Sequence, residues 1–168
     1  MNVKQKQIAV AMATAFAYSG FLLTFGGHLF APVSDTQDQL SYILAWLLLP
    51  ALSLLMGIGN LARTRFFDSG LIDGEAPEQN SRAEIDARYL QNTLEQFALA
   101  SIVFMSLGAQ LHEQELPLIA ALCSNFFLMR ILFWVGYRKL PQLRAIGFAG
   151  TFYPTVGAFV YAAWLATH

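Results

Sequence analysis

Long stretches without Asp, Glu, Lys or Arg are the feature that most limits the folds open to this chain of 168 residues. Four such runs occur, at 8–29, 40–62, 96–111 and 145–167, and a fifth, 116–137, is interrupted only by Arg130. Because about 20 helical residues cross a hydrocarbon core roughly 30 Å thick, and a helix satisfies its own backbone there, each run fits a membrane span. The runs therefore predict an all-α integral membrane protein with five transmembrane helices.

Composition narrows the function classes. The chain is 56% hydrophobic and only 12% charged, which is more apolar surface than a soluble domain of this size can bury. No basic patch with interleaved aromatic residues suggests a nucleic-acid partner. The three histidines are scattered and the single cysteine, Cys123, lies inside an apolar run, so we expect no metal site and interpret Cys123 as a packing residue.

The charged residues predict an orientation in the membrane. If the N-terminus is cytoplasmic, all 10 Lys and Arg residues fall on or near the cytoplasmic side. The far side then holds Asp35, Asp38, His112, Glu113, Glu115 and His168. This distribution follows the positive-inside rule, and five spans place the C-terminus on the far side.

A layer of polar side chains lies near the cytoplasmic boundary. Arg88, Asn92 and Glu95 are four and three residues apart, which stacks them on one helical face. Counted from the far-side ends of their helices, Glu95 and Arg130 lie at roughly 24 Å and 21 Å, nearly the same depth. Charged groups at membrane depth should face the bundle interior or a subunit interface and pair with one another. One interpretation is a purely structural ion pair between Glu95 and Arg130.

The fourth run continues this layer. Arg130, Phe133 and Tyr137 share a face, and Arg144 follows a short turn. Taken alone, Arg144 can also be interpreted as one more basic residue that anchors the cytoplasmic side under the positive-inside rule. Arginines, a carboxylate, an amide and a phenol in one layer can together hold a small zwitterionic or anionic ligand.

These motifs resemble the MAPEG family, the membrane-associated proteins of eicosanoid and glutathione metabolism. The resemblance is carried by Arg88, Asn92 and Glu95 at their spacing, by the series Arg130, Tyr137 and Arg144, and by residues 59–67, which resemble the end of the first helix in bacterial members. It covers about residues 40–168. It implies a MAPEG-like four-helix membrane domain at 36–168, with 1–35 as an extra N-terminal transmembrane helix.

The resemblance also implies a site and partners. Family members assemble as homotrimers that hold glutathione between subunits near the cytoplasmic boundary. By position, the residues expected to bind glutathione are Arg88, Asn92, Glu95, Arg130 and Tyr137, with Arg63 and Arg65 reaching the neighbouring subunit. Arg144 matches the arginine that stabilises the glutathione thiolate, the nucleophile of a conjugation.

The expected function is a membrane-bound glutathione transferase-like protein of the bacterial inner membrane, conjugating or reducing an apolar electrophile that arrives from the bilayer. The alternative is a non-catalytic lipid-binding or scaffold protein of the same fold. Three positions depart from eicosanoid-forming members, which argues against a named eicosanoid activity: Gln96 replaces an aromatic residue, Phe133 a tyrosine, and Leu90 a polar residue. A small transporter fits less well, because the polar groups gather at one boundary.

Overall fold

A computed structural model describes residues 3–33, 38–68, 70–71, 76–79, 81–138 and 140–168. Asp35 and Lys139, which entered the charge pattern above, lie outside the described residues. The regular elements are the helices α1 (Val3–Phe25), α2 (Gln39–Phe67), α3 (Arg82–Gly108), α4 (Pro117–Arg138) and α5 (Pro141–Leu165), with a 3-10 turn, η1 (Gly26–Leu29), after α1. Every regular element in the described ranges is helical, which confirms the all-α prediction.

Four of these helices are long and apolar enough to cross a membrane: Gln5–Leu29, Gln39–Phe67, Pro117–Arg138 and Gln142–Leu165. The chain is therefore an integral membrane protein. α3 falls short of this apolarity because its first half carries charged residues, although its second half coincides with the predicted run at 96–111. At 27 residues α3 is roughly 40 Å long, so it can span the hydrocarbon core and still extend its polar half toward the boundary.

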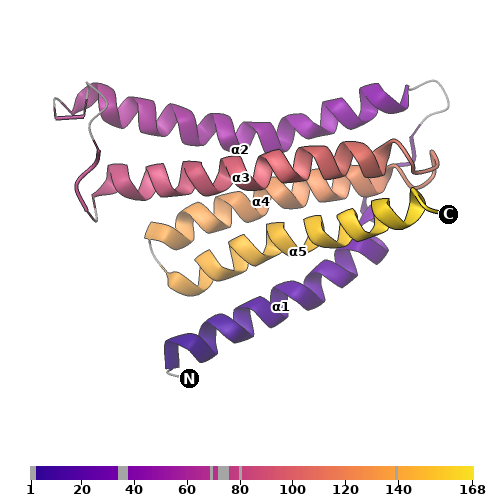
Figure 1. Ribbon diagram of the computed structural model, residues 1–168, viewed down its shortest axis with the longest axis horizontal. Coiled ribbons are helices and arrows are strands. Elements are labelled where there is room, and N and C mark those ends of the chain that lie inside the picture. Colours follow the sequence, from indigo (N-terminus) through magenta and orange to yellow (C-terminus); the bar gives the residue numbers. More distant parts are fainter. Residues whose placement is uncertain (1–2, 34–37, 69, 72–75, 80, 139) are drawn as a thin grey trace.

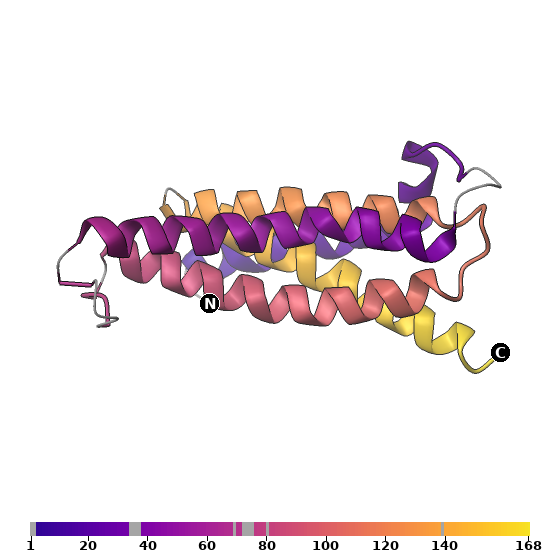
Figure 2. The same ribbon diagram turned by 90° about the horizontal axis from the view of Figure 1, so that it is seen from above.

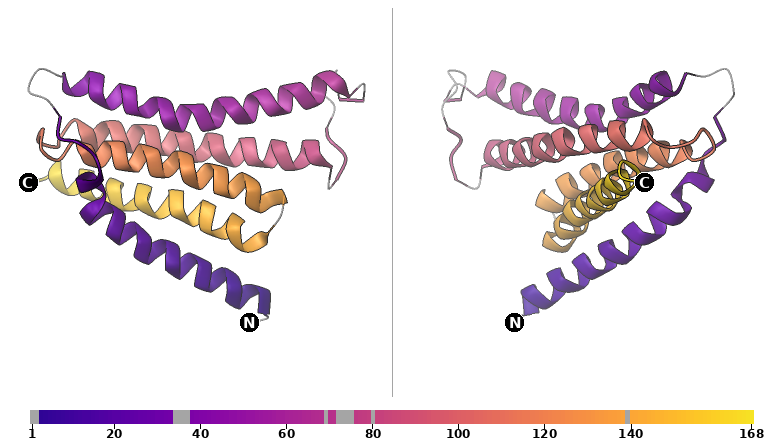
Figure 3. Two further views of the ribbon diagram at one scale, coloured as in Figure 1. Left: turned by 180° about the vertical axis from the view of Figure 1, so that it is seen from behind. Right: turned by 45° about the vertical axis from the view of Figure 1, so that its right-hand side comes forward.

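The helices α2, α3, α4 and α5 lie side by side as a bundle, and α1 lies outside it against α5 (Figure 1). Seen from behind, the helices keep this order, and α1 diverges from the bundle toward its N-terminal end (Figure 3). Seen from above, α2 and α3 lie next to each other (Figure 2). The chain termini lie at opposite ends of the bundle (Figure 1). One end contains the starts of α1, α3 and α5, and the other contains the C-terminus. We call these the N-terminal end and the far end.

The core is built around α4, which packs against α2, α3 and α5 and, at its start, against η1. Its first half is almost wholly buried, and Ile119 and Phe126 lie in one cluster with Leu47 of α2 and Leu107 of α3. By contrast, the outer faces of α1 and α2 expose large apolar side chains. An apolar exterior suits lipid contact, because acyl chains carry no penalty against exposed Leu or Phe.

Candidate functional site

The start of α3 determines where the site lies. Ser81 and Glu84 form the S-x-x-E pattern that begins many helices, and the Ser81 hydroxyl accepts a hydrogen bond from the Glu84 backbone N–H at 3.1 Å. The helix therefore begins at Arg82, well before the apolar run. The helix therefore includes Asp86, which lies in the second turn of α3 and is buried.

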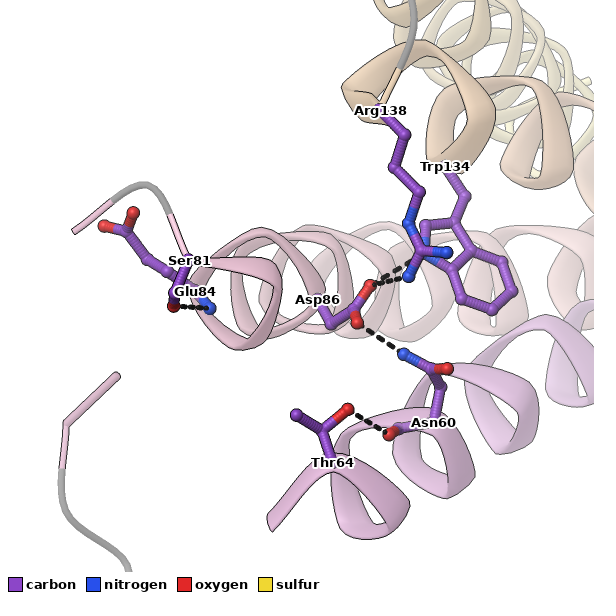
Figure 4. A network of polar contacts seen from close by, with 7 residues as sticks. All are labelled: Asn60, Thr64, Ser81, Glu84, Asp86, Trp134 and Arg138. Atoms are coloured by element: carbon purple, nitrogen blue, oxygen red, sulfur yellow. Dashed lines mark hydrogen bonds and ion pairs between the residues drawn. The ribbon is translucent and has the colours of Figure 1, made fainter. Parts of the chain in front are cut away.

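Asp86 joins three helices at the N-terminal end of the bundle (Figure 4). Its Oδ1 accepts hydrogen bonds from the indole Nε1 of Trp134 at 2.9 Å and from Nη2 of Arg138 at 2.6 Å. Its Oδ2 accepts one from the Asn60 side-chain amide. A carboxylate with three donors is well compensated in an apolar setting, so Asp86 ties α2 and α4 to α3.

Arg130 forms the second buried network, one turn deeper. It is fully buried, and its guanidinium donates to Oδ1 of Asn92 at 2.8 Å, to the Gly147 carbonyl at 3.2 Å and to the Thr151 hydroxyl at 2.9 Å. It also lies 4.2 Å from the centre of the Phe133 ring, a cation–π contact. Each of these partners is neutral, and in the part of the chain described here no carboxylate lies within ion-pair distance of Arg130.

The interpretation of Glu95 and Arg130 as a structural ion pair is therefore wrong for the described single chain. Glu95 is exposed, and its Oε1 accepts a hydrogen bond from the Gln91 amide at 2.9 Å. The physical reason is the rotation of α3: Asn92 sits at the edge of its polar face and reaches inward to Arg130, whereas Glu95 points outward. Glu95 is thus exposed and Arg130 buried, although the count along the sequence places them at nearly the same depth.

The outward face of α3 forms a shallow groove with the end of α4. It is a wide, open depression of about 530 Å³. We call this depression the α3 groove. Its lining residues are Glu84, Ala87, Arg88, Gln91, Asn92, Glu95 and Tyr137. Within it Arg88 pairs with Glu84 at 2.7 Å, and both belong to α3. Its volume lies within the range of small-molecule sites, roughly 300 to 1,000 Å³.

Arg144 approaches the groove through the turn between α4 and α5. A Cβ at Gly136 would overlap the backbone of Arg144, so a glycine is needed for α5 to begin so close to α4. The Arg144 guanidinium consequently lies 5.0 Å from the centre of the Tyr137 ring. It is exposed and is not itself part of the groove lining.

The structure thus brings together most of the residues predicted from sequence. Arg88, Asn92, Glu95 and Tyr137 line the α3 groove. Arg130 contacts it from behind through Asn92, and Arg144 from the side through Tyr137. Arg63 and Arg65, at the end of α2, do not line it, and their contact with a neighbouring subunit stays a prediction.

Sequence reasoning missed four participants, namely Asp86, Trp134, Arg138 and Thr151. The sequence does contain a signal for Asp86. It continues the buried stripe of α3 toward the start of the helix, at the helical spacing of Asp86, Tyr89, Thr93 and Gln96. Trp134 and Arg138 lie at the same spacing on α4, but their shared partner on α3 is not visible in the sequence.

Chemically, the α3 groove offers both signs of charge. Arg88 supplies a guanidinium, Glu84 and Glu95 supply carboxylates, and Gln91, Asn92 and Tyr137 supply neutral donors and acceptors. Such a set suits a small ligand that carries both ammonium and carboxylate groups. The uncompensated positive charge of Arg130 behind Asn92 further favours a ligand of net negative charge.

Comparison with known families gave one match, in which the model of the MAPEG family covers residues 40–164. The match begins after α1 and η1 and spans α2 to α5. Comparison with curated proteins and with solved structures gave no match.

Proposed function

Because the chain belongs to the MAPEG family, we propose that it is a membrane-bound glutathione transferase-like enzyme that conjugates or reduces apolar electrophiles with glutathione. One observation carries the proposal. The α3 groove combines Arg88, Glu95 and Tyr137 on one surface and is backed by a buried arginine that no described carboxylate neutralises.

Glutathione fits this charge pattern as a co-substrate. It is a short peptide with an ammonium group, two carboxylates and a thiol. Glu84 and Glu95 suit the ammonium group, and Arg88 suits a carboxylate. Asn92 can donate its amide hydrogens to the ligand while its oxygen stays bonded to Arg130, and that bond polarises the amide. The groove therefore gains an attraction for anions from a charge that solvent does not reach.

Arg144 is proposed to stabilise the thiolate. A free thiol titrates near pH 8.5, and a fixed cation nearby favours the deprotonated form. The proton passes to solvent, the thiolate sulfur attacks the electrophilic carbon, and a C–S bond forms as the leaving group departs with its electron pair. Large apolar side chains are exposed on the outer surface of the bundle, so an apolar electrophile can approach from the bilayer while glutathione enters from the cytoplasm.

We further propose a homotrimer in the bacterial inner membrane, with the N-terminus in the cytoplasm. The support is that charged and amide side chains, among them the pairs Arg88–Glu84 and Gln91–Glu95, line the open face of the α3 groove. Polar groups at this depth are costly against lipid, so a second copy covering the groove lowers that cost. Arg63 or Arg65 of the neighbouring copy would then complete the site. Native mass spectrometry of the detergent-solubilised protein tests the trimer directly.

The deciding experiment compares turnover of a general electrophile by the wild type, by Arg144→Ala and by Arg82→Ala, an exposed arginine that lies outside the groove. Arg144→Ala should lower kcat at least about tenfold and move the pH–rate curve to higher pH, because the bound thiol loses its cation. Arg82→Ala should behave as wild type. Normal turnover by Arg144→Ala would remove this residue from the mechanism.

A non-catalytic lipid-binding or scaffold role has one observation in its favour: Arg144 stacks on Tyr137 and does not itself line the groove. A thermal-shift titration separates the two functions, since a ligand that binds only the native state raises apparent stability. A shift with millimolar glutathione but no turnover would favour the binding role. No shift at all would exclude any glutathione-dependent function.

A further inference from the structure

A second pocket lies at the far end of the molecule, away from the α3 groove. It encloses about 510 Å³. Half of its lining comes from the end of α1 and the segment after it, and the rest from the α3–α4 connection, the start of α4 and Tyr161 of α5. We call it the far-end pocket. Because the family match begins at residue 40, the segment that forms half of this pocket lies outside the matched region.

Specific contacts hold the N-terminal helix in the position that forms the pocket. The Tyr18 hydroxyl donates to Oδ1 of Asn125 on α4 at 3.0 Å, and the Asn125 amide donates to the Gly150 carbonyl of α5 at 2.8 Å. At Gly27 of η1 a Cβ would lie 3.3 Å from the Leu118 backbone nitrogen. The glycine therefore lets η1 approach the start of α4 closely, which places α1 across one side of the pocket.

Among the described residues, the lining consists of an apolar wall and one carboxylate, that of Glu115. Leu111 and Leu118 are buried in the wall. Glu115 is held in place at both oxygens, since Oε1 accepts from the Tyr161 hydroxyl at 3.4 Å and Oε2 from the His112 backbone N–H at 3.3 Å. No Lys or Arg occurs among the lining residues that the structure describes. Charge complementarity therefore favours a cationic group beside apolar chains, and disfavours an anionic headgroup.

We propose that the far-end pocket binds the ammonium headgroup of an aminophospholipid from the surrounding bilayer. Glu115 accepts a charge-assisted hydrogen bond from the ammonium, and Tyr161 presents its aromatic ring beside it. Gln114 and His28 supply donors for the adjoining phosphate. The acyl chains lie against the exposed apolar surface of the same N-terminal segment, which includes Phe21, Phe25 and Leu29. The N-terminal helix thereby gains a role that is independent of the glutathione site.

The test measures lipid binding to the purified full-length protein by native mass spectrometry and thermal shift. The probes are phosphatidylethanolamine, phosphatidylglycerol with identical acyl chains, and glycerophosphoethanolamine, which has the headgroup without chains. The proteins are wild type, Glu115→Gln, and the matched control Glu113→Gln, whose carboxylate is exposed and outside this pocket. Wild type should bind phosphatidylethanolamine at least about tenfold more tightly than phosphatidylglycerol.

Glu115→Gln should reduce that preference to within about twofold, whereas Glu113→Gln should retain it. Equal binding of the two lipids by wild type overturns the proposal without depending on any variant. A preference that survives in Glu115→Gln also overturns it. Equal binding of glycerophosphoethanolamine would assign the pocket to a soluble amine and not to a lipid.

Discussion

The two polar faces of α3 are composed of similar residues but are bonded in different ways. On the inward face, Asp86 is bonded by side chains from two other helices (Figure 4). On the outward face, the partners of Arg88 and Glu95 among the described residues are side chains four residues away on α3 itself. The first arrangement holds helices together, whereas the second leaves its groups available.

The two faces differ in how much free energy is lost when their hydrogen bonds are broken. Interhelical hydrogen bonds in an apolar interior have no replacement from solvent, so breaking one leaves unsatisfied groups on several helices. An i,i+4 pair on an exposed face contributes only about 0.2 to 0.5 kcal/mol and exchanges readily for a ligand or a neighbouring chain. Structural and functional polar residues are thus distinguished by their partners and not by residue type.

The largest expected effect is on the inward face. Asp86→Ala leaves Trp134, Arg138 and Asn60 without their shared acceptor, and we expect a loss of about 3 kcal/mol of stability. Thermal unfolding in detergent would measure it as a lower Tm. The loss in the double variant Asp86→Ala/Arg138→Ala should be less than the sum of the single losses, because the two residues are bonded to each other. Additive losses would show that the network in Figure 4 does not act as a unit.

Arg130 connects the two faces, because it is buried and yet bonded to Asn92 in the groove lining. Arg130→Met replaces a desolvated charge with an apolar side chain, so stability should fall less than in Asp86→Ala. Glutathione affinity should fall about tenfold, since the attraction for an anion is lost. Arg130→Lys keeps the charge and should recover most of the affinity. Isothermal titration calorimetry measures the affinity. Unchanged glutathione affinity in Arg130→Met would show that the buried charge does not contribute to binding in the α3 groove.

The sequence predicted the helical membrane fold and the polar layer because both depend on local patterns. Charge-free runs define spans, and the spacing of Arg88, Asn92 and Glu95 places them on one face. It did not predict which neighbour that face would meet. The rotation of α3 is set by packing between helices, so Glu95 was paired with Arg130 when Asn92 is the actual partner. Likewise α1 lies against α5, far from it in sequence, and no local pattern specifies that choice.

The start of α3 can also be predicted from a local signal, which the apolar run alone does not contain. The apolar run at 96–111 marks the part of the helix in lipid, but the helix begins where its cap lies, at Ser81. The capping pattern of Ser81 and Glu84 predicts that Asp86 and Arg88 lie in one helix, on different faces. The identity of Asp86 as a shared acceptor would still require the positions of α2 and α4.

A smaller effect is expected on the outward face. Arg88→Ala removes an exposed pair with Glu84 and should change stability by no more than about 0.5 kcal/mol. Glutathione affinity should nevertheless fall at least about tenfold, because a charge-assisted contact with a ligand carboxylate is lost. Arg82→Ala is the control, as another exposed arginine of α3 outside the groove. A large drop in Tm for Arg88→Ala would mean that the outward face also holds the fold together.

The smallest effect concerns Asp38, whose bonds are local in the same way as those of the outward face. It caps α2, accepting from the Ser41 backbone N–H at 2.9 Å and from the Ser41 hydroxyl at 3.0 Å. The backbone hydrogen bond, followed by the hydroxyl, lowers the pKa of this carboxyl below its ordinary value. Its contribution to stability is therefore complete above the ordinary pKa of about 3.9 and is lost as pH falls through the lowered one. Asp38→Asn keeps a good cap but cannot titrate, so its Tm should fall less than that of wild type between about pH 4 and pH 2. Parallel Tm curves for the two proteins would show that this local cap contributes nothing to the acid response.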